Sequence, residues 1–231
     1  MRRLVLFDID GTLLVSASSG RDAIQAAFAE EFDDLSFFES VRFDGKTDPQ
    51  IVRELYEAAG HPSRATPERT TELLDRYLAH LERTVATPAD RVRPLPGIVP
   101  LLDALTQRPN VVLGLLTGNV VRGATLKLGA AGLPLDRFVV GAYGSDSAHR
   151  PDLPPIAAQR AEAYFGRVPT GQEVVILGDT PADVTCGASI GARAIAVATG
   201  SYSREVLHAA GAHASFDTFV DTNAVLDAIF G

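Results

Sequence analysis

Residues 4–15 (LVLFDIDGTLLV) constrain what this chain can fold into more than any other stretch. Their apolar start, rich in Leu and Val, is typical of a β-strand that is buried on both faces. This strand ends in two carboxylates, Asp8 and Asp10, followed by a Gly-Thr pair. Two acidic groups this close to a low-dielectric core repel each other, so we expect a cation or a transferred proton to compensate them.

The composition indicates a globular protein and limits the partners that it can bind. The chain has 231 residues, 46% of them hydrophobic, which is ample for a sizeable core. Its formal net charge is -8 and it has no block of Lys or Arg. Nucleic-acid and anionic-membrane surfaces both need a clustered positive field, so neither partner is expected, and a small-molecule substrate is favoured.

Location and redox state follow from two further features. No apolar run approaches the roughly 20 residues that span a bilayer, and the N-terminus lacks the pattern of a signal peptide. We therefore expect a cytoplasmic protein. Cys186 is the single cysteine, which excludes an internal disulfide, and we expect it to pack against a helix rather than to react.

The chain divides into a helical stretch and an alternating one. Apolar residues recur at helical spacing within residues 16–90, which predicts amphipathic helices throughout. Later in the chain short apolar strands alternate with helices, a pattern typical of a parallel sheet with crossover helices. We expect an α/β core of residues 1–15 and 91–231, with residues 16–90 inserted as a lid over the ligand-binding edge of the sheet.

The expected elements have recognisable boundaries. Besides the first strand, we expect strands at residues 111–116, 138–140, 174–177 and 194–198, with a weaker one at 214–216. The helices of the insertion are expected to begin at Ser18 or Ser19, at Thr47 or Asp48, and at Thr66 with Pro67. Those of the core are expected at about 98–107, 120–131, 152–165, 182–190, 203–210 and 221–229, with caps at Asn119, Thr180 and Ser203.

Polar side chains follow two more of these strands. Thr117, Gly118 and Asn119 follow one, where a hydroxyl and free N–H groups can bind an anionic oxygen; an ordinary Asn cap after a glycine turn is the alternative. Asp179 ends the other, and Asp183 either faces the same edge or completes a capping box with the preceding threonine. All these groups can meet, because the carboxyl ends of parallel strands share one edge of the sheet.

Together, Asp8, Asp10 and Asp179 form a hard-oxygen cluster suited to Mg²⁺. Zinc is not indicated, because the five histidines are scattered without ligand spacing. An acidic site that receives a phosphate ester needs a further cation. Arg150, just before the helix expected at 152–165, is the best-placed candidate, and an ordinary surface role is the alternative.

Four segments, in this order, resemble the four motifs of the haloacid dehalogenase superfamily. They are DIDGT at 8–12, LTGN at 116–119, RPD at 150–152 and GDTPAD at 178–183. Specifically, the chain resembles the phosphoglycolate phosphatase-like hydrolases with a helical cap, over nearly its whole length. The resemblance implies a Rossmann-like, doubly wound parallel sheet, with residues 16–90 as the helical cap domain inserted after the first motif.

The resemblance also implies roles for the acidic residues. Asp8 would be the nucleophile that becomes an aspartyl-phosphate, and Asp10 the general acid that later acts as base. Mg²⁺ would be bound by Asp8, by the main-chain carbonyl of Asp10 and by Asp179, with Asp183 as a nearby ligand or orienting group.

The remaining motif residues would bind the phosphoryl group. The resemblance assigns its oxygens to Thr117, Gly118 and Asn119 and the stabilisation of its charge to Arg150. The family usually has Lys in the position of Arg150, and the two cations are not interchangeable. Lys46, in the insertion, either reaches the site and binds the leaving group or belongs only to a turn and helix cap.

The acid at position 10 separates possible reactions within the superfamily. A halide leaving group needs no proton, so Asp10 favours phosphate-ester chemistry over carbon-halogen cleavage. We expect a Mg²⁺-dependent phosphatase that acts on a small phosphorylated metabolite, such as phosphoglycolate or a sugar phosphate. The alternatives are a sugar phosphomutase of the beta-phosphoglucomutase type and a non-catalytic phosphate-binding or receiver-like domain, which would need no helical lid.

Overall fold

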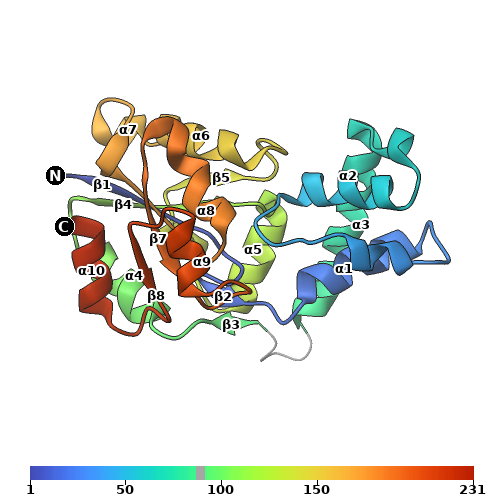
Figure 1. Ribbon diagram of the computed structural model, residues 1–231, viewed down its shortest axis with the longest axis horizontal. Coiled ribbons are helices and arrows are strands. Elements are labelled where there is room, and N and C mark those ends of the chain that lie inside the picture. The colour runs from blue at the N-terminus through green and yellow to red at the C-terminus, as the bar shows by residue number, and fades with distance from the viewer. Residues whose placement is uncertain (87–91) are drawn as a thin grey trace.

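The computed structural model describes residues 1–86 and 92–231, which form a six-stranded sheet with helices on both faces and a helical segment at one end (Figure 1). The strand order is β5-β4-β1-β6-β7-β8, and each adjacent pair is parallel. The predicted α/β fold with a Rossmann-like parallel sheet is therefore confirmed. The strands are β1 (Arg3–Phe7), β4 (Val111–Thr117), β5 (Val140–Tyr143), β6 (Val174–Gly178), β7 (Arg193–Val197) and β8 (Ala214–Phe216).

Strand β1 lies near the middle of the sheet and is buried on both faces, as its apolar sequence predicts. Leu4 and Leu6 face α6 and α8, whereas Val5 and Phe7 face α4, α5 and α10. Helix α9 covers β7 and β8. The core helices are α4 (Ile98–Thr106), α5 (Val121–Ala130), α6 (Leu153–Arg160), α7 (Glu162–Phe165), α8 (Pro181–Cys186), α9 (Arg204–Ala209) and α10 (Thr222–Phe230).

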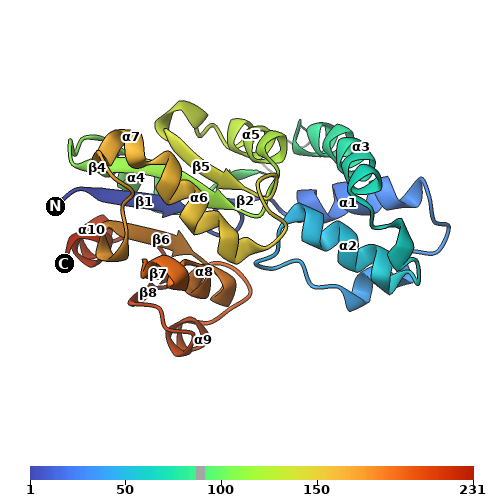
Figure 2. The ribbon, with the colours of Figure 1, turned by 90° about the horizontal axis from the view of Figure 1, so that it is seen from above.

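The helical segment, residues 16–86, lies beyond the carboxyl ends of the central strands (Figure 2). It contains α1 (Ser19–Ala29), α2 (Asp48–Ala58) and α3 (Pro67–Ala86), which pack around the buried rings of Phe28, Tyr56 and Tyr77. A short antiparallel pair, β2 (Leu14–Val15) and β3 (Arg93–Pro94), leads into it and out of it. Residues 87–90 of the expected insertion and the expected return to the core at residue 91 lie outside the described residues.

Three elements differ by more than one residue from the expected bounds. The strand expected at 138–140 is β5, which begins at Val140 because its pairing with β4 starts there, while the ring of Phe138 packs on Phe7 at 6.4 Å between centroids. The helix expected at 152–165 is divided into α6 and α7. The helix expected at 182–190 is α8, which ends at Gly187, followed by a 3-10 turn.

Two of the expected helix caps are confirmed and two are wrong. The side chains of Thr47 and Thr180 accept from the backbone N–H groups of Gln50 and Asp183, both at 3.2 Å, and so cap α2 and α8 as predicted. The caps expected at Asn119 and Ser203 are wrong, since in the described chain neither side chain makes a capping hydrogen bond. Val120 occupies the cap position of α5 instead, and the amide of Asn119 has other partners described below.

Two further expectations concern packing and membranes. Cys186 is buried, its thiol donates to the backbone oxygen of Asp183 at 3.3 Å, and burial raises its pKa to about 12, so it packs as predicted. Among the described helices, none has both the length and the apolar composition that a membrane crossing requires.

Candidate active site

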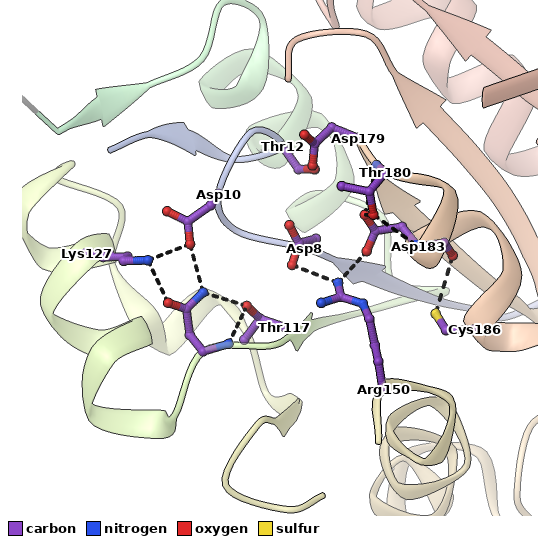
Figure 3. A network of polar contacts seen from close by, with 11 residues as sticks. Asp8, Asp10, Thr12, Thr117, Lys127, Arg150, Asp179, Thr180, Asp183 and Cys186 are labelled. Atoms are coloured by element: carbon purple, nitrogen blue, oxygen red, sulfur yellow. Dashed lines mark hydrogen bonds and ion pairs between the residues drawn. The ribbon is translucent and has the colours of Figure 1, made fainter. Parts of the chain in front are cut away.

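The carboxyl ends of β4, β1 and β6 lie side by side and bring most of the predicted site residues to one edge (Figure 3). Asp8 follows β1 directly, Thr117 is the last residue of β4, and Asp179 follows the last residue of β6. The N–H of Asp8 donates to the carbonyl of Leu177 at 2.9 Å, so the pairing of β1 with β6 continues up to this carboxylate. All three polar side chains are buried.

Arg150 joins two acidic residues of this edge. Its Nη2 donates to Oδ1 of Asp8 at 3.0 Å and also to Oδ1 of Asp183. It begins a 3-10 turn before α6, where Pro151 restricts the backbone. Burial alone lowers the pKa of this guanidinium, but the charges of Asp183 and Asp8 outweigh burial and raise it. Arg150 is therefore a permanent cation inside the site.

Asp8, Asp179 and Asp183 form the acidic cluster, in which one carboxylate oxygen from each lies within 4.8 Å of the others. Burial, together with the charge of Asp183, raises the pKa of Asp8 to about 7 and raises the pKa of Asp179 well above its ordinary value. Carboxylate oxygens are ligands that a hard divalent cation prefers, and its charge would offset the mutual repulsion of these three acids. The donor set therefore fits a divalent metal ion.

Asp183 has two structural roles at once. Its Oδ2 accepts from the backbone N–H of Thr180 at 3.0 Å and from the Thr180 hydroxyl at 2.7 Å, which completes the capping box of α8. Its Oδ1 binds Arg150 and belongs to the acidic cluster. Asp183 therefore both faces the acidic edge of the sheet and completes the capping box, the two roles that the sequence presents as alternatives.

Asp10 turns away from the acidic cluster (Figure 3). Its Oδ2 accepts from Lys127 Nζ at 2.6 Å and from Asn119 Nδ2 at 2.9 Å, and its Oδ1 accepts from Ser16 Oγ at 2.6 Å. Burial would raise the pKa of Asp10, but Lys127 and the hydrogen bonds outweigh it and lower the pKa. The expected grouping of the Asp10 carboxylate with those of Asp8 and Asp179 is wrong, and Asp183 takes its place.

The turn after Asp10 depends on a glycine. Gly11 has φ of +80°, and a Cβ at this position would lie 2.3 Å from Oδ2 of Asp179. The hydroxyl of Thr12, the next residue, donates to Oδ1 of Asp179 at 3.3 Å. The DIDGT segment therefore closes against the end of β6, which fixes Asp179 in the cluster.

The loop after β4 links the sheet edge to the helical segment. The hydroxyl of Thr117 accepts from the Asn119 backbone N–H at 3.2 Å and from its Nδ2 at 2.8 Å. The carbonyl of Gly118 accepts from the N–H of Asp48 at 2.8 Å, and Oδ2 of Asp48 accepts from the N–H of Val120 at 2.8 Å. This loop is therefore bound to the first turn of α2.

The comparison with known families decides the identity of this site. The family model of the haloacid dehalogenase-like hydrolases matches residues 2–191, which contain the ends of β1, β4 and β6. The chain is a haloacid dehalogenase-like hydrolase.

Individual relatives agree with this assignment. The phosphoglycolate phosphatase of Rhodospirillum rubrum is 30% identical over 226 residues, which cover 95% of this chain and 88% of that protein. The probable phosphatase IndB of Dickeya dadantii is 32% identical over 223 residues, which cover 95% and 91%. The predicted family and the prediction of a phosphatase-type enzyme are confirmed.

A solved structure shows the same fold at lower sequence identity. The beta-phosphoglucomutase (pgmB) of Clostridium difficile superimposes with a TM-score of 0.75 over 99% of this chain and 97% of that one, at 18% identity. This likeness shows a shared fold alone, and the fold is common to hydrolysis and to phosphoryl transfer between sugar positions.

Sequence reasoning missed Lys127 of this hydrolase. Its ammonium is buried and binds Asn119 Oδ1 at 2.7 Å as well as Asp10. A signal was present in the sequence: Lys127 is one helical turn from Ala124 and adjacent to Leu128, both of which face inward on α5. A lysine on the apolar face of a helix needs a buried partner, and here that partner is Asp10.

Lys46 also lines the cavity of the hydrolase, but its ammonium is paired with Glu54 of α2. Glu54 accepts a second hydrogen bond from Gln50 at 2.9 Å. The cavity has a volume of about 270 Å³ and lies between the strand ends and the helical segment. The segment contributes, among others, the following lining residues: Ser16, Ser18, Arg21, Phe43, Lys46 and Tyr77.

Proposed function

We propose that this hydrolase is a Mg²⁺-dependent phosphatase that acts on a small phosphorylated metabolite through an aspartyl-phosphate on Asp8. The observation that carries the proposal is the separation of the two loop carboxylates. Asp8 is buried in the acidic cluster and bound by Arg150, whereas Asp10 lies outside the cluster and is bound by Lys127. Different environments for two nearby acids suit different chemical roles.

In the first step, a carboxylate oxygen of Asp8 attacks phosphorus. A new bond from that oxygen to phosphorus forms as the bond to the leaving oxygen breaks, and Asp10 gives its proton to that oxygen. Arg150, 3.0 Å from Asp8, balances the charge shared by the nucleophile and the phosphoryl group. A phosphate dianion bound beside Asp10 favours the protonated form of this acid, because like charges raise the pKa of a carboxyl group.

In the second step, water hydrolyses the aspartyl-phosphate. Asp10, now a carboxylate held by Lys127 and Asn119, takes a proton from water as the water oxygen attacks phosphorus. The bond from phosphorus to the Asp8 oxygen breaks, which releases inorganic phosphate and restores Asp8. The hydroxyl of Thr117 and the backbone of Gly118 and Asn119 hold the phosphoryl oxygens.

The acidic cluster is the proposed Mg²⁺ site. Asp8 and Asp179 would be its carboxylate ligands, with Asp183 as ligand or orienting group, and the main-chain carbonyl of Asp10 would be a further ligand. When bound there, Mg²⁺ would supply positive charge that favours the ionised form of Asp8 and offsets the charge of the phosphate.

Residues 16–90 are the proposed lid, and the core is formed by residues 1–15 and 91–231. The cavity of about 270 Å³ beneath the lid supports a small substrate. The Dickeya relative, a probable phosphatase, supports a phosphate ester, and the Rhodospirillum phosphoglycolate phosphatase supports a small one. Phosphoglycolate and small sugar phosphates are the proposed substrate class, and Lys46 is the proposed specificity residue.

A metabolite panel tests this function. Phosphate release from 2-phosphoglycolate, glycerol phosphate, hexose phosphates and para-nitrophenyl phosphate is measured with Mg²⁺ and with EDTA. We expect Mg²⁺-dependent release from at least one alkyl ester and none from the Asp8→Asn variant, whose melting temperature stays within a few degrees of the wild type. Turnover by a folded Asp8→Asn variant would refute the covalent mechanism. Isomerisation of a sugar phosphate with a bisphosphate primer, without phosphate release, would identify a phosphomutase.

A further inference from the structure

Lys127 is a buried cation whose only part in the proposed reaction so far is its contact with Asp10. Its side chain is 6% exposed, and the neighbouring inward positions of α5 are Gly123, Ala124 and Leu128. An apolar side chain of similar length would fill the same space without the cost of removing an ammonium group from water. Packing therefore does not account for a charge at this position.

The partners of Lys127 form a closed triangle. Its Nζ donates to Asp10 Oδ2 at 2.6 Å and to Asn119 Oδ1 at 2.7 Å, while Asn119 Nδ2 donates to the same oxygen of Asp10 at 2.9 Å. Each of the three side chains thus binds the other two. The side-chain amide of Asn119 donates in turn to the Thr117 hydroxyl at 2.8 Å, which connects the triangle to the end of β4.

The triangle determines where the Asp10 carboxylate lies. Two donors occupy Oδ2, and Ser16 occupies Oδ1 at 2.6 Å from the opposite side. A carboxylate with donors on both oxygens has little rotational freedom. The Asp10 side chain is thereby kept apart from the acidic cluster and at the cavity between the strand ends and the helical segment.

Lys127 also lies against the helical segment. A Cβ built on Gly20, in the first turn of α1, would be 3.2 Å from the Lys127 Nζ. The Tyr77 hydroxyl of α3 would lie 3.9 Å from the same Cβ and 3.6 Å from one built on Gly123. The ammonium is therefore enclosed by α1 and α3 as well as by the core.

We propose that Lys127 is a positioning residue that holds the Asp10 carboxyl group where it can exchange a proton with the leaving-group oxygen. The inference rests on the proposed function, because it assigns Lys127 to the proton transfer of that reaction. Lys127 itself does not contact the phosphoryl group in this role. Lys127 acts through Asp10 alone.

Leaving-group dependence tests this role. The nitrophenolate of para-nitrophenyl phosphate departs without a proton, whereas an alkoxide needs one, and kcat/KM reports the first phosphoryl transfer. In Lys127→Met we expect kcat/KM for the best alkyl ester of the panel to fall by about 100-fold, and that for para-nitrophenyl phosphate by less than about threefold. Arg122→Met, which removes a half-exposed cation from the same helix, should leave both values unchanged.

A double variant separates positioning from a general effect on structure. Asp10→Asn should reproduce the selective loss on the alkyl ester, and Lys127→Met combined with Asp10→Asn should lose no more than Asp10→Asn alone. Lys127→Arg, which keeps a charged donor, should recover part of the alkyl activity. If the Met variant does not fold, the same ratio of alkyl to aryl kcat/KM is measured in Lys127→Arg and Lys127→Gln, and the loss should be larger in the Gln variant.

Equal losses on both esters in a folded Lys127 variant, or additive losses in the double variant, would overturn the positioning role. These outcomes leave the proposed function intact as long as Asp8→Asn is inactive. A wild-type protein that releases phosphate from no ester would instead overturn the proposed function itself, and with it the role of Lys127.

Discussion

The Nη2 nitrogen of Arg150 lies 3.0 Å from Oδ1 of Asp8, and the same nitrogen binds Asp183. One guanidinium therefore supplies the cation for two of the three acids in the cluster. Among the described buried polar atoms, Nε of Arg150 is one without a hydrogen-bond partner. Arg150 thus reaches both acids through the same nitrogen, Nη2, which a lysine ammonium can partly replace as a point charge.

Arg150→Met should destabilise the protein and inactivate it. Loss of one partner from a buried ion pair leaves the carboxylates uncompensated, at a cost on the order of 3 kcal/mol in the free energy of unfolding. We also expect kcat/KM to fall by more than about 100-fold, and Arg150→Lys to keep part of both. Urea unfolding and ester hydrolysis measure the two effects. Wild-type kcat/KM in Arg150→Met would contradict this role.

Metal binding should stabilise the fold. At a Mg²⁺ concentration about 100 times the Kd, we expect the melting temperature to rise by roughly 5 °C and EDTA to reverse the rise. The rise should diminish below pH 7, because the pKa of Asp8 is raised to about 7 and protons compete with the metal. Asp179→Asn should abolish it, whereas Asp217→Asn, which alters an exposed acid, should not. An unchanged rise in Asp179→Asn would place the metal elsewhere.

The sheet could be predicted from the sequence because its signals are local. The apolar run of β1 and the Thr180-Pro181 start of α8 each act over a few residues. The order of polar strand ends then follows from parallel topology, which brings Asp8 and Asp179 together. The predicted start of β5 at Phe138 is wrong because this apolar residue does not belong to the strand. Its ring packs on Phe7, whereas the pairing with β4 begins at Val140.

The direction of the Asp10 side chain could not be predicted from its neighbours in sequence. It depends on Lys127, 117 residues later, whose approach is set by the packing of α5 on the sheet. Helical periodicity alone places Lys127 on the inward face of α5, but it does not identify the acid that Lys127 binds. Pairs of residues distant in sequence, such as Asp10 and Lys127, determine the chemistry of the site. The local sequence pattern determines the helices and strands that position these residues.

The substrate preference of the enzyme should respond to Lys46. Its ammonium lies at the cavity and is held by Glu54, so Lys46→Met removes a fixed charge from the lid side. We expect the variant to change the ranking of the metabolite panel while para-nitrophenyl phosphate hydrolysis changes by less than about threefold, because hydrophilic leaving groups depend on such contacts. Arg53→Met, at an exposed pair on the same helix, is the control. Equal changes on every ester would argue against a specificity role.

Asp48 should make stability depend on pH. Burial raises its pKa from 3.8 to about 6, against the opposing effects of Lys127 and the Val120 N–H, while Asp10 adds to the rise. The folded state thus binds the proton more tightly, and this contribution is full below pH 4 and lost as pH rises through 6.

The substitution Asp48→Asn isolates this effect, because an amide oxygen can still accept from the Val120 N–H. Relative to the wild type, the variant should gain on the order of 3 kcal/mol in the free energy of unfolding between pH 4 and pH 7.5. Urea unfolding at several pH values measures the difference. A difference that does not vary with pH would contradict the buried charge at Asp48.

Gly118 should control how closely the lid approaches the core. A Cβ at this position would lie 2.1 Å from the backbone oxygen of Lys46 and 2.9 Å from the Cα of Thr47, so Gly118→Ala must displace main chain at the start of α2. That displacement would strain the bond from the Asp48 N–H to the Gly118 carbonyl, now 2.8 Å.

We expect Gly118→Ala to lower kcat/KM by at least about tenfold on alkyl and aryl esters alike, because a displacement of about 1 Å in an active site costs up to about 100-fold. This common loss differs from the selective loss expected for Lys127 variants. Gly129→Ala is the matched control, since a Cβ there meets no atom within 4 Å and alanine favours the helix. Wild-type activity in Gly118→Ala would mean that the lid does not need this approach for turnover.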